Sequence, residues 1–540
     1  MTNLNLSGTQ PPWYVTTAIP YVNGKPHIGF AQEIILTDAL ARYHRLKGDD
    51  VWFLTGTDEN AFKNVQSAEQ EDIPTRELVD RNAQHFYNLR SVLNLSFDDF
   101  IRTSADPRHR AGVEKLWRAC DENGDIYKRP YSGLYCFGCE QFYTEGELIN
   151  GLCPEHLTAP TLIEEENYFF RLSRYADRLQ ELIASDQLQI LPQKRKNEVL
   201  SFIRGGLNDF SISRSQSRAH GWGIPVPGDP DQVIYVWFDA LDNYITALGY
   251  ADNAPAYQRY WTHNPHRVHV IGKGVIRFHA VYWPAMLLSA HVPVPTAILV
   301  HDYVTINGGK ISKSLGNTVD PVELTERYGT DALRYYLLRE IPSTEDGDFT
   351  LARFVHAYNS DLADQLGNLL NRVVSMVGRY YGGIVPTPGL LEAIDRRLIE
   401  TAQNVRGRID AALSRFALDE ALDAIWNLIG AANKYVADVK PWTLAKLRKN
   451  EGDDSPAGSW LSTVLYNLVE VLRLIAYHCA PFIPATADGI AQQLGISLST
   501  GENAQGASQG EEASSWGCYP VGTRVQPGDI LFPKIAQPIA

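Results

Sequence analysis

Hydrophobic residues over the first 325 positions alternate between short strand-like runs and longer segments with helical spacing. Residues 13–19 are rich in aromatic and β-branched side chains, whereas residues 30–47 carry apolar residues at helical spacing and stop at Gly48. The same alternation returns later, and its further strand-like runs are residues 51–54, 233–238, 268–272 and 297–300. This pattern predicts a doubly wound parallel sheet with helices on both faces.

The sheet pattern is interrupted once and gives way to helices near residue 355. Residues 126–230 contain cysteines, turns and short aromatic strands, so we expect an insertion that splits the sheet domain into residues 1–125 and 231–325. Residues 326–354 are expected to link this domain to residues 355–540, whose spacing is almost wholly helical. Helical segments near 355–381, 391–414, 417–439 and 459–479 predict a C-terminal helix bundle.

Length and composition narrow the class of protein. The chain has 540 residues, of which 44% are hydrophobic, enough for three or four packed domains. No run approaches the length of a membrane-spanning helix and the polar N-terminus lacks a signal-peptide layout, so we expect a soluble, cytoplasmic protein with no membrane partner. Six cysteines in so long a chain fit a reducing compartment with a metal site better than a disulfide framework.

The net charge of −14 argues against a polyanionic partner over most of the surface. Local clusters could still form basic patches, or they could be ordinary solvated faces, and charge alone does not decide. These clusters are residues 194–196, residues 214–218, Lys310 with Lys313, and Arg334 with Arg339.

The most specific local motif is the spacing Cys136-x2-Cys139-x13-Cys153-x2-His156. Three thiolates and one imidazole in two close pairs match tetrahedral zinc with no open position, so the predicted Zn²⁺ is structural. The alternative is a coincidental set of buried thiols. The other cysteines lack such spacing.

Residues 27–30, His-Ile-Gly-Phe, lie between the first predicted strand and the first long helix. A helix start presents unsatisfied backbone N–H groups and a positive dipole end, which favour a phosphate. His27 can donate to phosphate oxygens, and Gly29 leaves room for a nucleotide. A plain helix cap is the alternative interpretation.

A second segment supports the nucleotide interpretation. Residues 308–317, Gly-Gly-Lys-Ile-Ser-Lys-Ser-Leu-Gly-Asn, place two lysines and two serines in a glycine-flanked loop. Together the two segments resemble the HIGH-like and KMSKS-like motifs of class I aminoacyl-tRNA synthetases. From about residue 12 to about residue 450 the chain resembles the methionyl-tRNA synthetase family.

The resemblance implies an α/β fold with a split Rossmann-like sheet, a zinc-binding connective insertion and a helical anticodon-binding domain. It implies activation of L-methionine with ATP and Mg²⁺, then transfer to tRNA(Met). No protein nucleophile is needed, because the methionine carboxylate attacks the α-phosphate, so catalysis is positioning and charge stabilisation. The residues expected to bind ATP are His27, Gly29, Lys310, Ser312 and Lys313, of which His27, Lys310 and Lys313 are catalytic.

Asp58 lies in the segment 55–60 that follows the strand-like run 51–54, where parallel sheets bind ligands, and its carboxylate suits an α-ammonium group. A turn-capping aspartate is the alternative. The resemblance implies that Asp58 binds the amino group of methionine and that the side-chain pocket is made by Ala18, Ile19, Tyr21, Trp237, Ala240, Tyr244, Ile276, His279 and Trp283. Because a thioether is only a weak acceptor, we expect selection by shape, aromatic contact and donors such as Tyr21 and His279.

Asn368 and Arg372 lie four residues apart on one predicted helical face, and Pro441-Trp442 is expected to end a later helix. An aromatic platform with amide and guanidinium donors is typical of sites that read splayed bases. The resemblance implies that Asn368, Arg372 and Trp442 read the anticodon. A packed tryptophan and a solvated arginine are the alternative. No C-terminal oligonucleotide-binding domain of the kind that makes some relatives dimeric is found, so we expect a monomer.

Three departures from the family pattern concern ATP handling. Phe30 replaces the second histidine of the first motif, Asn60-Ala61 replaces a His-Gly pair, and Gly274 replaces an aspartate expected near the ribose. Two other hypotheses therefore remain: a paralogue that delivers an adenylate to another acceptor, and a tRNA-binding homologue with little catalysis.

Overall fold

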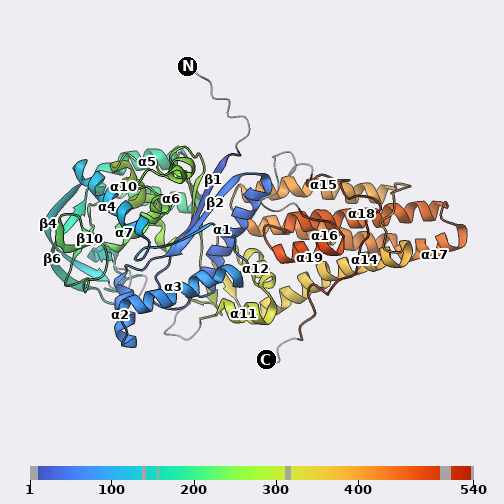
Figure 1. Ribbon diagram of the computed structural model, residues 1–540, viewed down its shortest axis with the longest axis horizontal. Coiled ribbons are helices and arrows are strands. Elements are labelled where there is room, and N and C mark those ends of the chain that lie inside the picture. The colour runs from blue at the N-terminus through green and yellow to red at the C-terminus, as the bar shows by residue number, and fades with distance from the viewer. Residues whose placement is uncertain (1–9, 137–140, 155–156, 311–317, 499–512, 537–540) are drawn as a thin grey trace, which may run out of the picture.

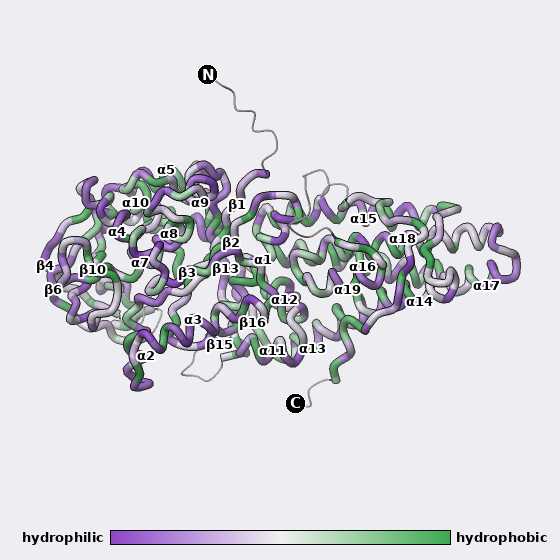
Figure 2. Tube along the Cα trace, viewed as in Figure 1, coloured by the Kyte–Doolittle hydropathy of each residue, from purple (hydrophilic) through white to green (hydrophobic). Residues whose placement is uncertain are grey.

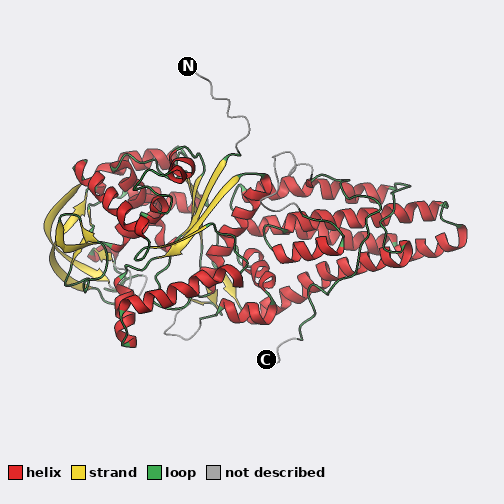
Figure 3. Cartoon of the chain, viewed as in Figure 1, coloured by secondary structure: helices red, strands yellow, loops and turns green. Residues whose placement is uncertain are grey.

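The structure is a computed structural model that describes residues 10–136, 141–154, 157–310, 318–498 and 513–536. The molecule is elongated, with an α/β body at one end and a helix bundle at the other (Figure 1). Strands lie in the α/β body and in the link beside it, whereas the described part of the bundle consists of helices joined by loops (Figure 3). The predicted division into a sheet-containing and a helical part is therefore confirmed.

The α/β body is built on a six-stranded sheet in the order β3-β2-β1-β12-β13-β7. All five neighbouring pairs are parallel, as the alternating pattern predicts. The strands are β1 (Pro12–Thr17), β2 (Asp50–Thr57), β3 (Asp99–Arg102), β7 (Gln189–Leu191), β12 (Arg267–Gly272) and β13 (Ala297–His301). The two halves of the split sheet meet where β1 pairs with β12.

Helices cover both faces of this sheet because β1 is apolar on both sides. Trp13 and Val15 belong to one buried core, which includes α1 (Ile28–Lys47) and α12 (Thr330–Arg339), whereas Tyr14 belongs to the other core. The second core contains residues of α4 (Pro107–Glu122) and α10 (Trp283–Ser289). A strand buried on both faces reads as a continuous apolar run, and this is the signal at residues 13–19.

The predicted insertion, residues 126–230, is more heterogeneous than its sequence suggested. Its antiparallel sheet has the order β5-β4-β6-β8, made of β4 (Ile126–Cys136), β5 (Gln141–Tyr143), β6 (Thr161–Phe170) and β8 (Phe210–Ser211). Between β6 and β8 the chain returns to the main sheet as edge strand β7, with α5 (Ala176–Ala184) and α6 (Gln193–Arg204) beside it. The three residues of β7 were too few to show as a separate strand in the pattern.

The link between the two bodies contains α11 (Pro321–Tyr328), α12 and a small sheet of β14 (Val304–Ile306), β15 (Gly309–Lys310) and β16 (Gly347–Phe349). The bundle follows as α13 (Leu351–Ala357), a π-helical stretch (Tyr358–Gly367), α14 (Asn368–Tyr381), α15 (Ala393–Leu413), α16 (Leu418–Val439), α17 (Pro441–Glu451), α18 (Pro456–Cys479) and α19 (Pro484–Gln493). All four predicted helical segments are present, but Pro441-Trp442 begins α17 and does not end a helix. Proline fits the first turn of a helix, where its missing N–H costs nothing.

Helix α18 is the centre of the bundle. It is long and apolar enough to cross a membrane, but 89% of its most apolar window is buried inside the protein, so it is a core helix. One hydrophobic core runs from β1 through α1 and α12 into the bundle, and Figure 2 shows hydrophobic residues along α1 and α12 at this junction.

A buried ion pair fastens the junction. The Arg334 guanidinium is fully buried, lies 2.8 Å from the Asp38 carboxylate of α1 and donates to the carbonyls of Leu93 and Phe482. It therefore contacts the sheet body and the bundle at once. Arg334 and Arg214 were predicted to lie in basic patches or on solvated faces. Both are buried, so neither interpretation holds for them.

Candidate active site

A cavity of about 270 Å³ opens at the carboxyl ends of β1 and β12. Seven residues of the predicted methionine pocket line it, together with Phe30 and Glu33 of α1 and with Tyr303, which follows β13. Those seven are Ala18, Ile19, Tyr21, Trp237, Ala240, Tyr244 and His279. Ile276, Trp283 and Asp58 do not line the cavity, although all three are buried close to residues that do.

The floor of the cavity is a hydrogen-bonded pair of rings. The Tyr244 hydroxyl lies 2.7 Å from His279 Nε2, and His279 Nδ1 lies 2.9 Å from the Val275 carbonyl oxygen. A carbonyl only accepts, so the ring proton is on Nδ1 and the tyrosine hydroxyl donates to Nε2. Burial lowers the pKa of His279 to about 4, which keeps the ring neutral. The expectation that His279 donates to a ligand sulfur is therefore not supported: its one N–H is already used.

The aromatic walls have a second layer behind them. Trp237 stacks on Phe278 with centroids 3.8 Å apart and an interplanar angle of 4°. Trp283 lies behind Tyr244, with ring centroids 6.1 Å apart, and its indole N–H donates to His269 at 3.3 Å. Trp283 therefore shapes the cavity through Tyr244, which explains why it matches the family's pocket positions without lining the space.

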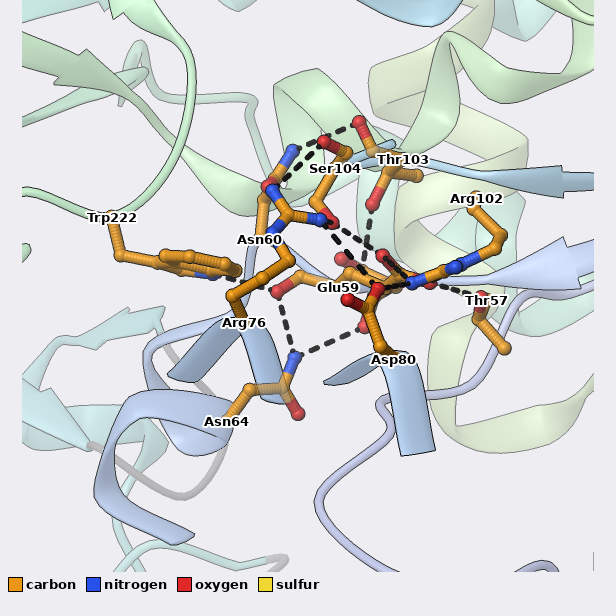
Figure 4. A network of polar contacts seen from close by, with 11 residues as sticks. Thr57, Glu59, Asn60, Asn64, Arg76, Asp80, Arg102, Thr103, Ser104 and Trp222 are labelled. Atoms are coloured by element: carbon orange, nitrogen blue, oxygen red, sulfur yellow. Dashed lines mark hydrogen bonds and ion pairs between the residues drawn. The ribbon is translucent and has the colours of Figure 1, made fainter. Parts of the chain in front are cut away.

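Asp58 precedes Glu59, whose side chain is the centre of the polar network in Figure 4. The fully buried Glu59 carboxylate accepts from Thr57, from both Nε and Nη2 of Arg102, and from Ser104. The Trp222 indole, from the chain that returns out of the insertion, donates to the Glu59 carbonyl at 2.8 Å. A carboxylate with this many donors makes the turn after β2 rigid, and so fixes the backbone of Asp58 beside the cavity.

The Asp58 backbone is also tied to the cavity wall. Its N–H donates to the Pro20 carbonyl at 2.9 Å, and Tyr21 forms a parallel bridge with Asp58. The two loops that follow β1 and β2 are thus held side by side.

Asn60, a departure from the family pattern, joins the two halves of the sheet domain. Its amide donates to Asp239 at 2.7 Å, and the other carboxylate oxygen of Asp239 lies 2.6 Å from His109 Nε2. His109 Nδ1 in turn lies 2.9 Å from the Thr246 hydroxyl. The Asn60 amide can make this hydrogen bond in place of the family's histidine, so the hydrogen-bond network around Asp239 is complete.

The start of α1 is capped by the histidine of the first motif. His27 is the N-cap residue, and its Nδ1 accepts from the Gly29 N–H at 3.1 Å. His27 therefore caps the helix, which does not exclude a nucleotide, because a neutral ring that accepts at Nδ1 carries its proton on Nε2. Phe30 packs edge-on against Phe86 with centroids 5.2 Å apart and replaces a hydrogen-bond donor with an apolar contact.

The lysine motif lies only partly within the described residues. Lys310 ends β15, which pairs with β14 just after β13, so the motif starts at the cavity's edge of the sheet. Ser312 and Lys313 lie outside the described residues, as do Cys139 and His156 of the cysteine motif. Cys136 and Cys153, which are described, are both buried and belong to one small cluster with Tyr143.

The three predicted anticodon residues all lie on the surface of the bundle. Asn368 begins α14 and is exposed, Arg372 is half-buried one turn later, and the Trp442 side chain on α17 is 48% exposed. Arg448 of α17 donates to the Tyr380 carbonyl at 2.8 Å, so the ends of α14 and α17 lie together. Trp442 is therefore not a core residue, which excludes the packed tryptophan of the alternative interpretation.

Glu33 and Tyr303 are among the cavity residues that sequence reasoning missed. Glu33 sits inside an apolar helix that otherwise packs on the sheet, and an acidic residue on a buried face is a signal that could have been used. Tyr303 follows β13, and residues after parallel strands often face ligands. A Cβ added to Gly274 would lie 2.2 Å from the Tyr303 hydroxyl, so this tyrosine occupies the space of the missing aspartate.

Comparison with known proteins gives consistent matches over the whole chain. A family model described as class I tRNA synthetases (M) matches residues 13–159 and 156–374, and a model of the anticodon binding domain of methionyl tRNA ligase matches residues 385–538. The methionine–tRNA ligase of Caldanaerobacter subterraneus is 44% identical over 529 residues, which cover 97% of this chain and 79% of that protein. The methionine–tRNA ligase of Brucella suis is 46% identical over 488 residues, which cover 90% and 92%.

A solved structure agrees with these relatives. The Mycobacterium tuberculosis methionyl-tRNA synthetase, determined in complex with methionyl-adenylate, superposes with a TM-score of 0.90 at 42% identity. The superposition covers 97% of this chain and all of that one.

Proposed function

The chain belongs to the methionyl-tRNA synthetase family of class I aminoacyl-tRNA synthetases and is a methionine–tRNA ligase, and we propose that the 270 Å³ cavity holds the methionine side chain beside the ATP site. The observation that carries this assignment is the cavity itself. Aromatic side chains line it at the carboxyl ends of β1 and β12, and the capped start of α1 lies next to it.

The cavity suits a thioether better than a polar side chain. Trp237 and Tyr244 offer aromatic surface to sulfur, and the neutral His279 ring presents no charge. The N–H of His279 is held by a backbone carbonyl, so we assign the choice of methionine to shape and aromatic contact, to which Tyr21 at the wall contributes. Asp58 is proposed to take the α-ammonium group, because its backbone is bonded to the loop that lines the cavity.

ATP is proposed to bind across the start of α1. The Nε2 proton of His27 supplies a donor for phosphate oxygens, and the helix dipole favours the same anion. Gly29 leaves room there, and Lys310, Ser312 and Lys313 are proposed to contact the phosphates. Mg²⁺, when bound with ATP, would supply further positive charge for the pyrophosphate. The methionine carboxylate attacks the α-phosphate, the bond to pyrophosphate breaks, and methionyl-AMP forms. The terminal ribose hydroxyl of tRNA(Met) then attacks the methionyl carbonyl and AMP leaves.

Recognition of tRNA(Met) is assigned to Asn368, Arg372 and Trp442. Support comes from the exposure of the Trp442 ring and from the packing of α17 against the end of α14. An exposed indole on α17, together with amide and guanidinium donors on the neighbouring helix α14, is suited to stack and pair with unstacked bases.

A structural zinc site is proposed for Cys136, Cys139, Cys153 and His156. The support is that two of these thiols, from separate segments, meet in one buried cluster. Among the described residues no group of three metal-binding side chains is found, and two of the four proposed ligands are not among them. The metal would stabilise the insertion and take no part in the reaction.

Methionine-dependent ATP–pyrophosphate exchange, followed by charging of tRNA(Met), tests the function. The enzyme is expected to perform both. Exchange without charging would favour a paralogue with another acceptor, and absence of exchange would favour a tRNA-binding homologue.

A further inference from the structure

A buried carboxylate, Glu33, joins the ends of three neighbouring strands beside the cavity. One of its oxygens accepts from the Ala18 N–H, which follows β1, at 2.8 Å. The other accepts from the Gly272 N–H at the end of β12, at 3.1 Å, and lies 2.9 Å from Nε2 of His301 at the end of β13. Both side chains are more than 90% buried.

The hydrogen bonds around Glu33 and His301 point to an ion pair. His301 Nδ1 lies 2.8 Å from the Asp302 carbonyl oxygen, which only accepts, so Nδ1 carries a proton. Nε2 faces a carboxylate oxygen that already receives a backbone N–H, and a second proton must lie between these two atoms. The N–H groups on both Glu33 oxygens favour its ionised form, which places that proton on the ring and makes His301 an imidazolium.

The other charged side chains near Glu33 and His301 are bonded to partners of their own. Asp302 is held by Lys194 and Arg195 of α6, and Lys273 is held by Asp346. The imidazolium and the Glu33 carboxylate therefore have each other as the matching charge within contact distance.

We propose that the Glu33–His301 ion pair positions the ATP-binding end of α1, a role that rests on the proposed function. Glu33 lies six residues after His27 on the same helix, so fixing Glu33 to the strand ends also fixes the direction in which the His27 ring points. Glu33 and His301 are positioning residues, because no reacting atom needs to touch them.

Loss of the Glu33–His301 pair should affect the methionine side and the ATP side of the cavity differently. The Ala18 N–H has a second acceptor, the Val270 carbonyl at 3.2 Å, so the methionine side keeps a partner when Glu33 is changed. In Glu33→Gln the amide would donate to a neutral His301, but its NH₂ group would also face the Gly272 N–H. Loss of the pair should therefore act on ATP and spare methionine.

The test compares Glu33→Gln and His301→Gln with wild type and with His478→Gln, which removes a buried histidine from the bundle. We expect the rate of methionyl-adenylate formation at limiting ATP to fall on the order of 10²-fold in both pair variants, the loss that a displacement near 1 Å produces. The methionine Kd should change by less than about threefold. The double variant should be no slower than either single one, and His478→Gln should behave as wild type.

A nitrogen NMR spectrum of histidine-labelled wild type at pH 7.5 reads the pair directly, with His301→Gln for assignment and the neutral His279 and His478 as internal references. Both ring nitrogens of His301 should be protonated. A neutral His301, or Glu33→Gln with wild-type kinetics for ATP, would overturn the proposal. Because the spectrum needs no activity, an inactive wild type with a protonated His301 would refute the enzyme assignment alone and leave the ion pair standing.

Discussion

The Tyr244 hydroxyl should matter to methionine binding although it faces a protein residue. It is the donor to Nε2 of the fully buried His279, whose other nitrogen is bonded to Val275. In Tyr244→Phe that nitrogen loses its hydrogen-bond partner at a buried position. An unpaired buried acceptor costs about 1–3 kcal/mol, so we expect the free energy of unfolding to fall by about 2 kcal/mol.

The Tyr244→Phe substitution should also weaken methionine binding. The His279 ring lines the cavity, and without the hydroxyl it must turn or take up water, either of which disturbs the apolar surface offered to the side chain. We expect the methionine Kd to rise about tenfold, equal to about 1.4 kcal/mol, as measured by calorimetric titration. Binding of ATP alone should not change, because the Tyr244 hydroxyl bonds to His279 and not to a residue at the start of α1.

The matched control is Tyr466→Phe. That hydroxyl donates to the Tyr519 carbonyl inside the bundle, so its loss should lower stability by about 1 kcal/mol and leave methionine affinity unchanged. If Tyr244→Phe lost stability while keeping the wild-type methionine Kd, the hydroxyl would support the fold only. The assignment of the cavity floor would then be wrong.

Three other predictions concern charge. Lys313→Ala should lower the rate of adenylate formation, measured by rapid-quench kinetics, on the order of 10²-fold with little change in methionine Kd. A normal rate with a raised methionine Kd would show instead that the residue binds methionine. Arg334→Met leaves the Asp38 carboxylate buried without its partner, so urea unfolding should show a loss of about 3–5 kcal/mol, and a loss below about 1 kcal/mol would contradict the buried pair. Burial lowers the pKa of His478 to about 4 from its ordinary 6.5, so between these values the unfolded chain binds a proton that the folded chain does not, and stability falls as the pH drops. In His478→Gln the free energy of unfolding should fall by about 3 kcal/mol less than in wild type between pH 7 and pH 4. Parallel curves of unfolding free energy against pH for the two proteins would contradict this prediction.

The sequence predicted the elements that depend on periodic burial. Strand β1 and helix α1 are each marked by their own spacing, and α18 by its apolar content, because solvent exclusion on one or both faces leaves a repeating pattern. Short elements leave none. Strand β7, with three residues, was therefore missed. Helix α17 was misplaced for another reason: its first residue is a proline, which was expected to end a helix.

The candidate site could be predicted only where a family motif or a strand end marked it. The aromatic residues of the cavity were found in this way, but the roles of single atoms were not. Nothing in the sequence shows that the N–H of His279 is taken by Val275, because that bond depends on the local turn of the backbone. Glu33 and His301 are 268 residues apart, and their pairing follows from the tertiary fold alone.

The central claim is that methionine and ATP meet between the aromatic cavity and the capped start of α1. A crystal structure of the wild-type protein with a non-hydrolysable methionyl-adenylate analogue tests it most directly. The methionine side chain should lie between Trp237 and Tyr244, with its ammonium group toward Asp58 and the phosphate oxygens facing Nε2 of His27. An analogue bound elsewhere, or a cavity that stays closed with His27 turned away from the ligand, would contradict the account.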